Sequence, residues 1–144
     1  GGISSPMIAH WPKGIKTAPG EITEQPGHLI DFMATFIDVA NATYLKNVEG
    51  RQVDPLQGKS LAPIFNGGKR TPHEKLYFHF GFDRAWREGD WKLVSAKRGR
   101  WELYNLATDR TEMHDLAEKN PHIVKRLRTQ WETWAHKTDV NFKK

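Results

Sequence analysis

The sequence lacks cysteine, a long apolar run and a recognisable leader. Without a thiol the chain can form neither disulfides nor thiolate metal sites, although this does not fix its compartment. No apolar run approaches the roughly 18 residues that a membrane span needs, so we expect no membrane partner. Residues 1–5 have neither the charged nor the apolar region of a signal peptide, and the first residue is Gly1 rather than Met. We therefore expect the chain to begin inside a longer protein.

Charge of one sign is not concentrated anywhere along the chain. There are 22 Lys and Arg against 17 Asp and Glu, which gives a formal net charge of +5. The densest basic groups, at 97–100 and 125–128, are short and have acidic residues nearby, which is typical of a solvated surface. A nucleic-acid-binding protein presents a wider single-sign surface, so we expect no nucleic-acid partner.

The motifs of common catalytic sites are also missing. The seven histidines show no zinc-ligand spacing backed by a helix pattern, and the glycine pairs lack the context of a phosphate-binding loop. No G-x-S-x-G elbow is present, and no base is identifiable near Ser4 and Ser5. We therefore predict no catalytic residue and no metal or cofactor site in this segment.

The N-terminal half predicts a strand, a helix and long loops. The apolar run at 6–12 is bracketed by prolines and suits a strand. Residues 28–42 carry apolar side chains at three- and four-residue spacing, which predicts an amphipathic helix with Asp31 near its start. His28 lies three residues before Asp31, so we expect a local hydrogen bond there. Most of the remainder up to residue 75 is rich in Gly and Pro and predicts loops.

The C-terminal half predicts a sheet and a helix that covers it. Strand-like segments separated by Gly-containing turns indicate an antiparallel meander, and they lie at 76–82, 84–87, 91–94 and 101–106. Asn120 and Pro121 suit the start of a helix, with Asn120 as the N-cap. An apolar stripe that ends in Trp131 and Trp134 is predicted to bury these rings against one face of the sheet.

Aromatic and basic residues meet in the strand region. Aromatics beside Arg can stack on sugars, bases or an aromatic substrate, and the same composition also suits a core face with a charged rim. One alternative function is therefore a nucleic-acid-binding module. Another is a carbohydrate-binding domain that uses Trp86, Trp91 or Trp101 as a platform and needs at least one of these rings largely exposed.

Five short stretches, in order, resemble the formylglycine-dependent sulfatases, and most of all the bacterial arylsulfatases. The family patterns are G-G-x-x-x-P-x-I-x-x-W-P, x-x-I-D-x-x-x-T, L-x-G-x-S-L-x-P, R-A-x-R-x-G-D-W-K-L and E-L-Y-D-L-x-x-D-x-x-E. They correspond here to residues 1–12, 28–35, 56–63, 84–93 and 102–112. Each pattern alone is weak, but their order along the chain is specific.

The resemblance implies an α/β architecture in two parts. Residues 1–70 would be the C-terminal remnant of the large catalytic domain, with the last strand and helix of an alkaline-phosphatase-like fold and the crossing loop. Residues 71–144 would be the small C-terminal subdomain, an antiparallel sheet covered by the C-terminal helix. A strand and a helix separated from their sheet expose backbone and apolar surface, so we expect the isolated chain to self-associate.

The resemblance also implies a reaction, the hydrolysis of sulfate esters. In this family a formylglycine made from Cys or Ser within C/S-x-P-x-R supplies the nucleophile, and calcium held by Asp and Asn oxygens stabilises the sulfate charge. This chain has no Cys, and Ser4-Ser5-Pro6-Met7-Ile8 lacks the Arg of that motif. The segment is therefore expected to bind no cofactor and to be inactive alone. The parent protein would use calcium and formylglycine and be periplasmic or secreted.

One part of the chain is predicted to meet the sulfate-ester substrate of the parent enzyme. The family often carries a His before the hairpin, in a pattern like W-E-H-E-G-N-R-A, and the corresponding stretch here is 78–85. His79 is displaced by one place, which reverses the side of the strand on which it lies. We take His79 and Arg84 as the candidate substrate-binding residues, in one wall of the substrate cleft.

Overall fold

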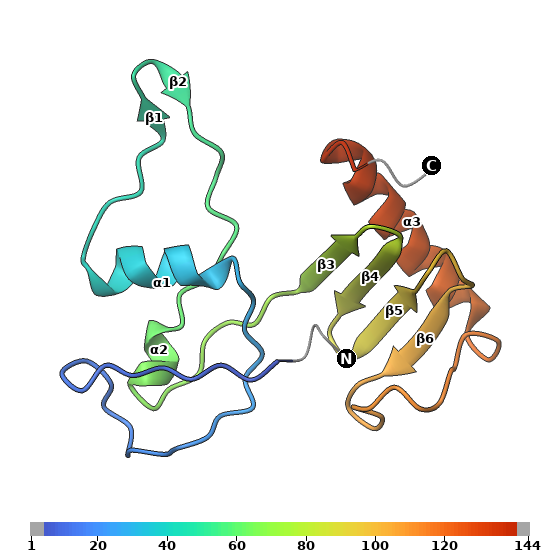
Figure 1. Cartoon of the computed structure of the whole chain (residues 1–144), viewed down its shortest axis with the longest axis horizontal. Helices are drawn as coiled ribbons and strands as arrows, with labels where there is room; N and C mark the ends of the chain where they lie inside the picture. The colour runs from blue at the N-terminus through green and yellow to red at the C-terminus, as the bar shows by residue number, and fades with distance from the viewer. Residues whose placement is uncertain (1–4, 141–144) are drawn as a thin grey trace. The chain divides into compact units, whose positions relative to one another are not determined.

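The computed structural model describes residues 5–140, which form two compact units that meet in sequence between Pro72 and His73 (Figure 1). The first unit has little regular structure, and the second is a sheet with one long helix. Each unit has its own hydrogen bonds and its own buried residues, so the two are described in turn.

The first unit contains two short helices and a small hairpin. Its elements are α1 (Asp31–Val39), β1 (Asn47–Val48), β2 (Arg51–Gln52) and α2 (Ala62–Phe65). The loops predicted for most of this half are confirmed, and α1 lies inside the predicted range 28–42 but is shorter. The β1–β2 hairpin was not predicted, because strands of two residues are too short to show a periodicity.

The strand predicted at 6–12 does not form, and this prediction was wrong for the chain as it stands. Met7 is 50% exposed, Ile8 93% and Trp11 42%. A strand is stabilised by backbone pairing with a neighbour, and no strand among the described residues lies beside this segment. The segment instead ends in a turn in which the Gly14 amide donates to the Trp11 carbonyl at 2.9 Å.

The apolar stripe of α1 is exposed. Phe32 is 37% exposed, Met33 56% and Phe36 63%, whereas the buried residues of the helix are Asp31, Ala34 and Thr35. The amphipathic pattern that predicted the helix is therefore real, but its apolar side has no cover within the first unit. Its opposite side is held by polar contacts, which are described below.

The second unit is built on a four-stranded antiparallel sheet in the order β3-β4-β5-β6 (Figure 1). Its strands are β3 (Lys75–Phe80), β4 (Asp83–Glu88), β5 (Trp91–Ser95) and β6 (Glu102–Asn105). The predicted meander is thus confirmed. In the central hairpin Glu88 pairs with Trp91 across the two-residue turn Gly89-Asp90, and Gly89 has a φ of +56°, which favours glycine.

Helix α3 (Pro121–Lys137) covers one face of this sheet. Its Leu127 and Trp131 are fully buried against Leu93 and Leu103, which confirms the predicted burial of Trp131. The Trp131 indole also donates from Nε1 to the Phe78 carbonyl at 3.2 Å, so its polar edge is satisfied. Trp134 packs at the edge of this core and is only half-buried, which is less than predicted.

The residue before α3 does not act as the predicted cap. Asn120 makes no side-chain capping hydrogen bond to the helix. Its side-chain amide instead donates to the Leu116 carbonyl at 3.1 Å, which stabilises the preceding turn. Pro121 lies at the first helical position and has no N–H. The start of the helix therefore has one fewer backbone donor that needs a partner.

Candidate functional site

The two candidate substrate-binding residues lie opposite each other in the second unit. His79 of β3 pairs in register with Arg84 of β4, and opposed residues share a face of the sheet. This is the face covered by α3, since the His79 ring centroid lies 6.1 Å from that of Trp131. The Arg84 guanidinium carbon lies 5.5 Å from the Trp131 centroid. The structure therefore brings both residues to one aromatic ring.

Arg84 is enclosed by aromatic side chains and bound to the sheet. Its guanidinium carbon lies 4.6 Å from the Trp101 centroid, and one of its nitrogens donates to Ser95 Oγ at 3.1 Å. Burial lowers the pKa of Arg84, Arg128 lowers it further, and Glu132 partly offsets the effect. An arginine still stays protonated at neutral pH, so this is a fixed positive charge with a structural partner.

His79 is half-buried on the same face. Its Nε2 is buried and has no hydrogen-bond partner among the described residues. The position of the family's His in the pattern W-E-H-E-G-N-R-A is taken here by Phe80, which is 86% exposed. Neighbouring residues of a strand point to opposite faces, so the one-place displacement turns His79 towards α3. Its role in substrate binding stays a prediction.

The exposed part of this end of the sheet is aromatic and cationic. The β3–β4 turn and the β5–β6 connection lie at the same end of the meander (Figure 1). Phe82 in the first is 53% exposed, and the Arg98 guanidinium carbon of the second lies 3.8 Å from its ring centroid. Sequence reasoning missed this pair. The predicted meander could have indicated it, because every second turn of a meander lies at the same end of the sheet.

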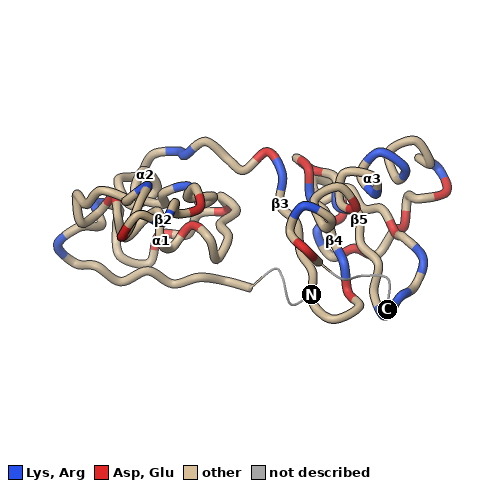
Figure 2. The backbone as a smooth tube through the Cα atoms, turned by 90° about the horizontal axis from the view of Figure 1, so that it is seen from above, with Lys and Arg blue, Asp and Glu red and all other residues tan. Residues whose placement is uncertain are grey.

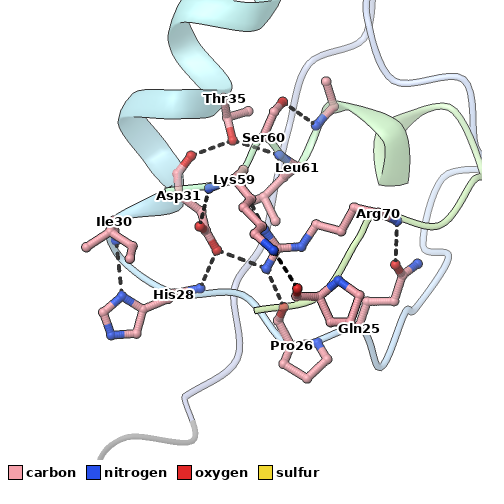
Figure 3. Close-up of polar contacts among 12 residues, drawn as sticks. Gln25, Pro26, His28, Ile30, Asp31, Thr35, Lys59, Ser60, Leu61 and Arg70 are labelled. Atoms are coloured by element: carbon pink, nitrogen blue, oxygen red, sulfur yellow. Dashed lines mark hydrogen bonds and ion pairs between the residues drawn. The ribbon is translucent and has the colours of Figure 1, made fainter. Parts of the chain in front are cut away.

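A second polar cluster holds the first unit together and is centred on a buried ion pair (Figure 3). The Asp31 side chain is fully buried and accepts from Arg70 at 2.9 Å. It also accepts from the backbone amides of His28 and Lys59, each at 2.8 Å. Arg70 in turn donates to the Lys59 carbonyl at 2.8 Å and to the Pro26 carbonyl at 2.6 Å. The expected hydrogen bond between His28 and Asp31 is thus confirmed, through the backbone of His28.

Two of the family-like patterns meet in this cluster, which explains their composition. Thr35 Oγ1 donates to the Asp31 carbonyl at 2.7 Å and accepts from the Leu61 amide at 2.9 Å (Figure 3). A β-carbon at Gly58 would lie 2.0 Å from the Ile30 carbonyl oxygen, so only glycine fits. The Asp and Thr of one pattern therefore bind the backbone of the other. A carboxylate with this many donors has a structural role.

The last family-like pattern also organises a loop. Glu112 forms an ion pair with Lys92, whose side chain is 6% exposed. Hydrogen bonds from the backbone amides of Met113 and His114 lower the pKa of Asp109. Burial, together with a hydrogen bond to Glu102, raises the pKa of Tyr104. Asp109 and Glu112 thus hold the chain that follows β6 in place.

The described residues were compared with the side-chain clusters that bind metal ions and with the helices that span membranes. No group of three or more His, Cys, Asp or Glu within residues 5–140 is arranged to hold a metal ion. Over the same range, no helix combines the length and apolar character that crossing a membrane requires. Formylglycine has no precursor Cys in the sequence, and Ser4 lies outside the described residues.

The alternative binding functions find little support. Trp86 is 5% exposed, and Trp91 and Trp101 are half-buried, so none of the three is the largely exposed platform that a carbohydrate-binding domain needs. Figure 2 shows Lys and Arg interspersed with Asp and Glu along each unit. A nucleic-acid-binding surface of one sign is therefore not favoured.

Known proteins similar to this chain are sulfatases. The family described as "N-sulphoglucosamine sulphohydrolase, C-terminal" matches residues 2–137. An ulvan-active sulfatase from Formosa agariphila is 36% identical over 61 residues, which are 42% of this chain and 12% of that protein. This chain therefore spans only a small part of the relative's length.

Solved structures give the same result. Ps i-CgsB has a TM-score of 0.65 and 26% identity over 88% of this chain and 27% of its own, and it was also solved in complex with k-i-k-neocarrahexaose. A protein crystallised with its substrate D-glucosamine-2-N,6-O-disulfate shares the fold, with a TM-score of 0.55 and 24% identity over 77% of this chain and 24% of its own. With a family match over nearly its whole length, this chain belongs to the N-sulphoglucosamine sulphohydrolase C-terminal family and is a C-terminal segment of a sulfatase.

Proposed function

We propose that this chain is the C-terminal part of a longer sulfuric ester hydrolase of the arylsulfatase branch. Residues 1–70 would complete the large catalytic domain, and residues 71–144 would form its small subdomain. The observation that carries the proposal is the family match over residues 2–137, together with a similar solved structure of which this chain covers 27%.

Within that enzyme the chain supplies scaffold and one wall of the substrate cleft. The ion pair of Asp31 and Arg70 ties two segments of the first unit into a fixed arrangement. In the second unit the end of the sheet that carries His79 and Arg84 also exposes Phe80 and Phe82. Exposed aromatic rings beside cations suit a sugar ring that carries an anionic group.

The reaction chemistry comes from outside this chain. Formylglycine would supply the nucleophile, and calcium would stabilise the sulfate charge. The described residues offer no carboxylate cluster for the metal and the sequence offers no cysteine for the aldehyde. The isolated chain is therefore inactive, and its own residues contribute position and shape to the cleft.

The substrate class is a sulfate ester on a saccharide. The ulvan-active relative and the saccharide bound to Ps i-CgsB support this class. Because polysaccharides do not cross membranes, the parent protein acts in the periplasm or outside the cell. The sulfate ester is its partner, and neither a nucleic acid nor a membrane is expected to bind this chain.

Sulfate release tests the proposal. The longer protein that carries this chain is incubated with sulfated oligosaccharides and calcium, and free sulfate is measured. The expected result is hydrolysis of a sulfate ester that stops when calcium is chelated. A longer protein that releases no sulfate from any sulfated saccharide or aryl sulfate would refute the proposed activity.

A further inference from the structure

The sheet of the second unit has two edge strands, and the chain closes one of them itself. β6 forms one edge and β3 the other (Figure 1). Along β6 the Leu103 amide donates to Asp115 Oδ1 at 3.0 Å, and the Leu103 carbonyl accepts from the Leu116 amide at 2.8 Å. The Asn105 carbonyl accepts from the Asp109 amide at 2.8 Å. The chain that follows β6 therefore satisfies the outer side of that edge.

The outer side of β3 has no such cover among residues 5–140. The two-residue turn makes Phe80 and Asp83 a hydrogen-bonded pair, so alternate residues of β3 direct their backbone groups towards β4 and the others direct them outwards. The outward set is Lys75, Tyr77 and His79. Within the described part of the chain no strand pairs with this side, and these backbone amides and carbonyls make no hydrogen bond to another backbone group.

The open strand also lacks the features that protect most sheet edges. Natural edge strands are commonly interrupted by Pro or by charged side chains. Residues 76–80, with the sequence Leu-Tyr-Phe-His-Phe, contain no Pro, Lys, Arg, Asp or Glu. An edge of this kind is a template to which another extended segment adds as a further strand.

The sequence of β3 is complementary to itself. In an antiparallel pair of copies with a two-fold axis at Tyr77, this residue would lie opposite its own copy, and Lys75 would lie opposite His79. The outward-facing positions are symmetric about Tyr77, so every outward amide and carbonyl would find a partner. On the face away from α3, Leu76 would lie opposite Phe78, which pairs two apolar side chains.

The same arrangement would cover aromatic rings that the second unit leaves partly exposed. Tyr77 packs on Trp134 with ring centroids 4.3 Å apart, and both side chains are half-buried. Directly opposed residues of a hydrogen-bonded antiparallel pair have Cα atoms about 5.5 Å apart, so the Tyr77 side chains of two copies would be neighbours. Burial of these rings favours a second copy of this chain over an unrelated extended peptide.

We propose that two copies of this chain associate through β3, antiparallel about a two-fold axis at Tyr77, and form one continuous sheet. The interface lies in the second unit and uses the backbone of β3, so it is separate from the apolar stripe of α1. It goes beyond the proposed sulfatase activity and does not depend on it.

Single cysteines test the register, because the chain has no cysteine of its own. The Cα atoms of Tyr77 in the two copies lie about 5.5 Å apart, within the range that a disulfide bridges. Those of Lys75 lie roughly 14 Å apart, because each Lys75 is opposite a position four residues further along the strand. With oxidised glutathione, Tyr77→Cys is expected to form a disulfide-linked dimer. Lys75→Cys, the control on the same side of the same strand, is expected to stay unlinked.

A backbone variant tests the hydrogen bonds of the interface. Tyr77→Pro removes an outward amide that the β3–β4 ladder does not use, whereas Tyr77→Leu loses the same ring but keeps the amide. All variants, including the cysteine variants, carry Met33→Gln and Phe36→Gln, which weaken association through α1. Sedimentation velocity is expected to give a dimer dissociation constant about tenfold or more higher for Tyr77→Pro than for Tyr77→Leu. Far-UV circular dichroism checks that each variant keeps the sheet.

Several results would overturn the proposal. These are a chain that stays monomeric at all concentrations in the Met33→Gln and Phe36→Gln background, equal cross-linking of Tyr77→Cys and Lys75→Cys, and equal dissociation constants for the Pro and Leu variants. If Tyr77→Pro loses the sheet, the cross-linking result decides. Because these measurements report association of this chain, their failure is distinct from a failure of the longer protein to hydrolyse sulfate esters.

Discussion

At the scale of single residues, the family-like patterns of the first unit are explained by hydrogen bonding. Asp31 and Thr35 each bind backbone amides from the segment around Lys59 and Leu61. Because Asp31 and Arg70 are both nearly excluded from water, removing either one leaves the other buried without its opposite charge. The pattern that resembles a sulfatase motif thus links helix α1 to the segment that precedes α2.

Asp31→Asn is expected to destabilise the first unit by about 3–5 kcal/mol, the usual loss when one member of a buried ion pair is removed. Hydrogen exchange of the α1 amides would report the change as a loss of protection. Asp38→Asn on the same helix is the control, because Asp38 is exposed and should cost about 0.5 kcal/mol or less. Equal protection in the two variants would show that the ion pair does not hold the unit.

At the scale of elements, the second unit depends on one helix packed on one sheet. Leu127 and Trp131 of α3 lie against Leu93 and Leu103, and all four are 0% exposed. Trp131 also makes edge-on contacts with Trp101 and Trp134, with ring centroids 6.0 and 6.1 Å apart. A small domain with such a concentrated core is sensitive to the loss of a single ring.

Trp131→Ala should therefore lower the free energy of unfolding by about 3–5 kcal/mol, because it leaves a cavity at a fully buried position. Trp134→Ala should cost clearly less, since that ring is half-buried. Urea denaturation followed by far-UV circular dichroism measures both. A larger loss for Trp134 than for Trp131 would contradict the assignment of the core.

Prediction from sequence succeeded where an element is stabilised by its own neighbours. The hairpin of β4 and β5 was predicted because its two strands are adjacent in the chain, and α3 was predicted because its own sequence shows the apolar stripe that packs on the sheet. The strand at 6–12 was not formed, since its pairing partners do not lie within the described residues. Arg70 was missed because its partner Asp31 is 39 residues away, a separation that no local pattern shows.

Only part of the candidate site was predicted, because a local pattern shows residues of one hairpin but not contacts between separate turns. His79 and Arg84 were singled out from a local pattern, and the structure places them opposite each other on one face. The contact of Arg98 with Phe82 joins two different turns, so periodicity alone does not indicate it. Only the order of strands in the meander brings these turns to one end of the sheet.

At the scale of the whole molecule, exposed apolar surface is the main feature of the first unit. Leu29, Ile8 and Ile22 are 75%, 93% and 88% exposed, in addition to the apolar stripe of α1. Surfaces of this kind are normally covered by another part of a protein or by a partner. In the proposed parent enzyme the large domain would cover them.

The isolated 144-residue chain is therefore expected to self-associate. Sedimentation velocity over a range of concentrations should show a weight-average mass that rises above the 16.6 kDa of one chain. Replacing Met33 and Phe36 with Gln should reduce the association, whereas Asp38→Asn should not. A monomer at all concentrations, with fast hydrogen exchange at residues 6–11, would contradict this expectation.

The central claim is that this chain has the fold of a C-terminal sulfatase segment but no sulfatase activity of its own. One activity measurement tests it most directly. The pure 144-residue chain is incubated with 4-nitrophenyl sulfate and calcium, and release of 4-nitrophenol is followed over time. Without a formylglycine precursor in its motif or a metal cluster among the described residues, we predict no turnover above the uncatalysed rate. Release of 4-nitrophenol that scales with the concentration of the chain would contradict the account.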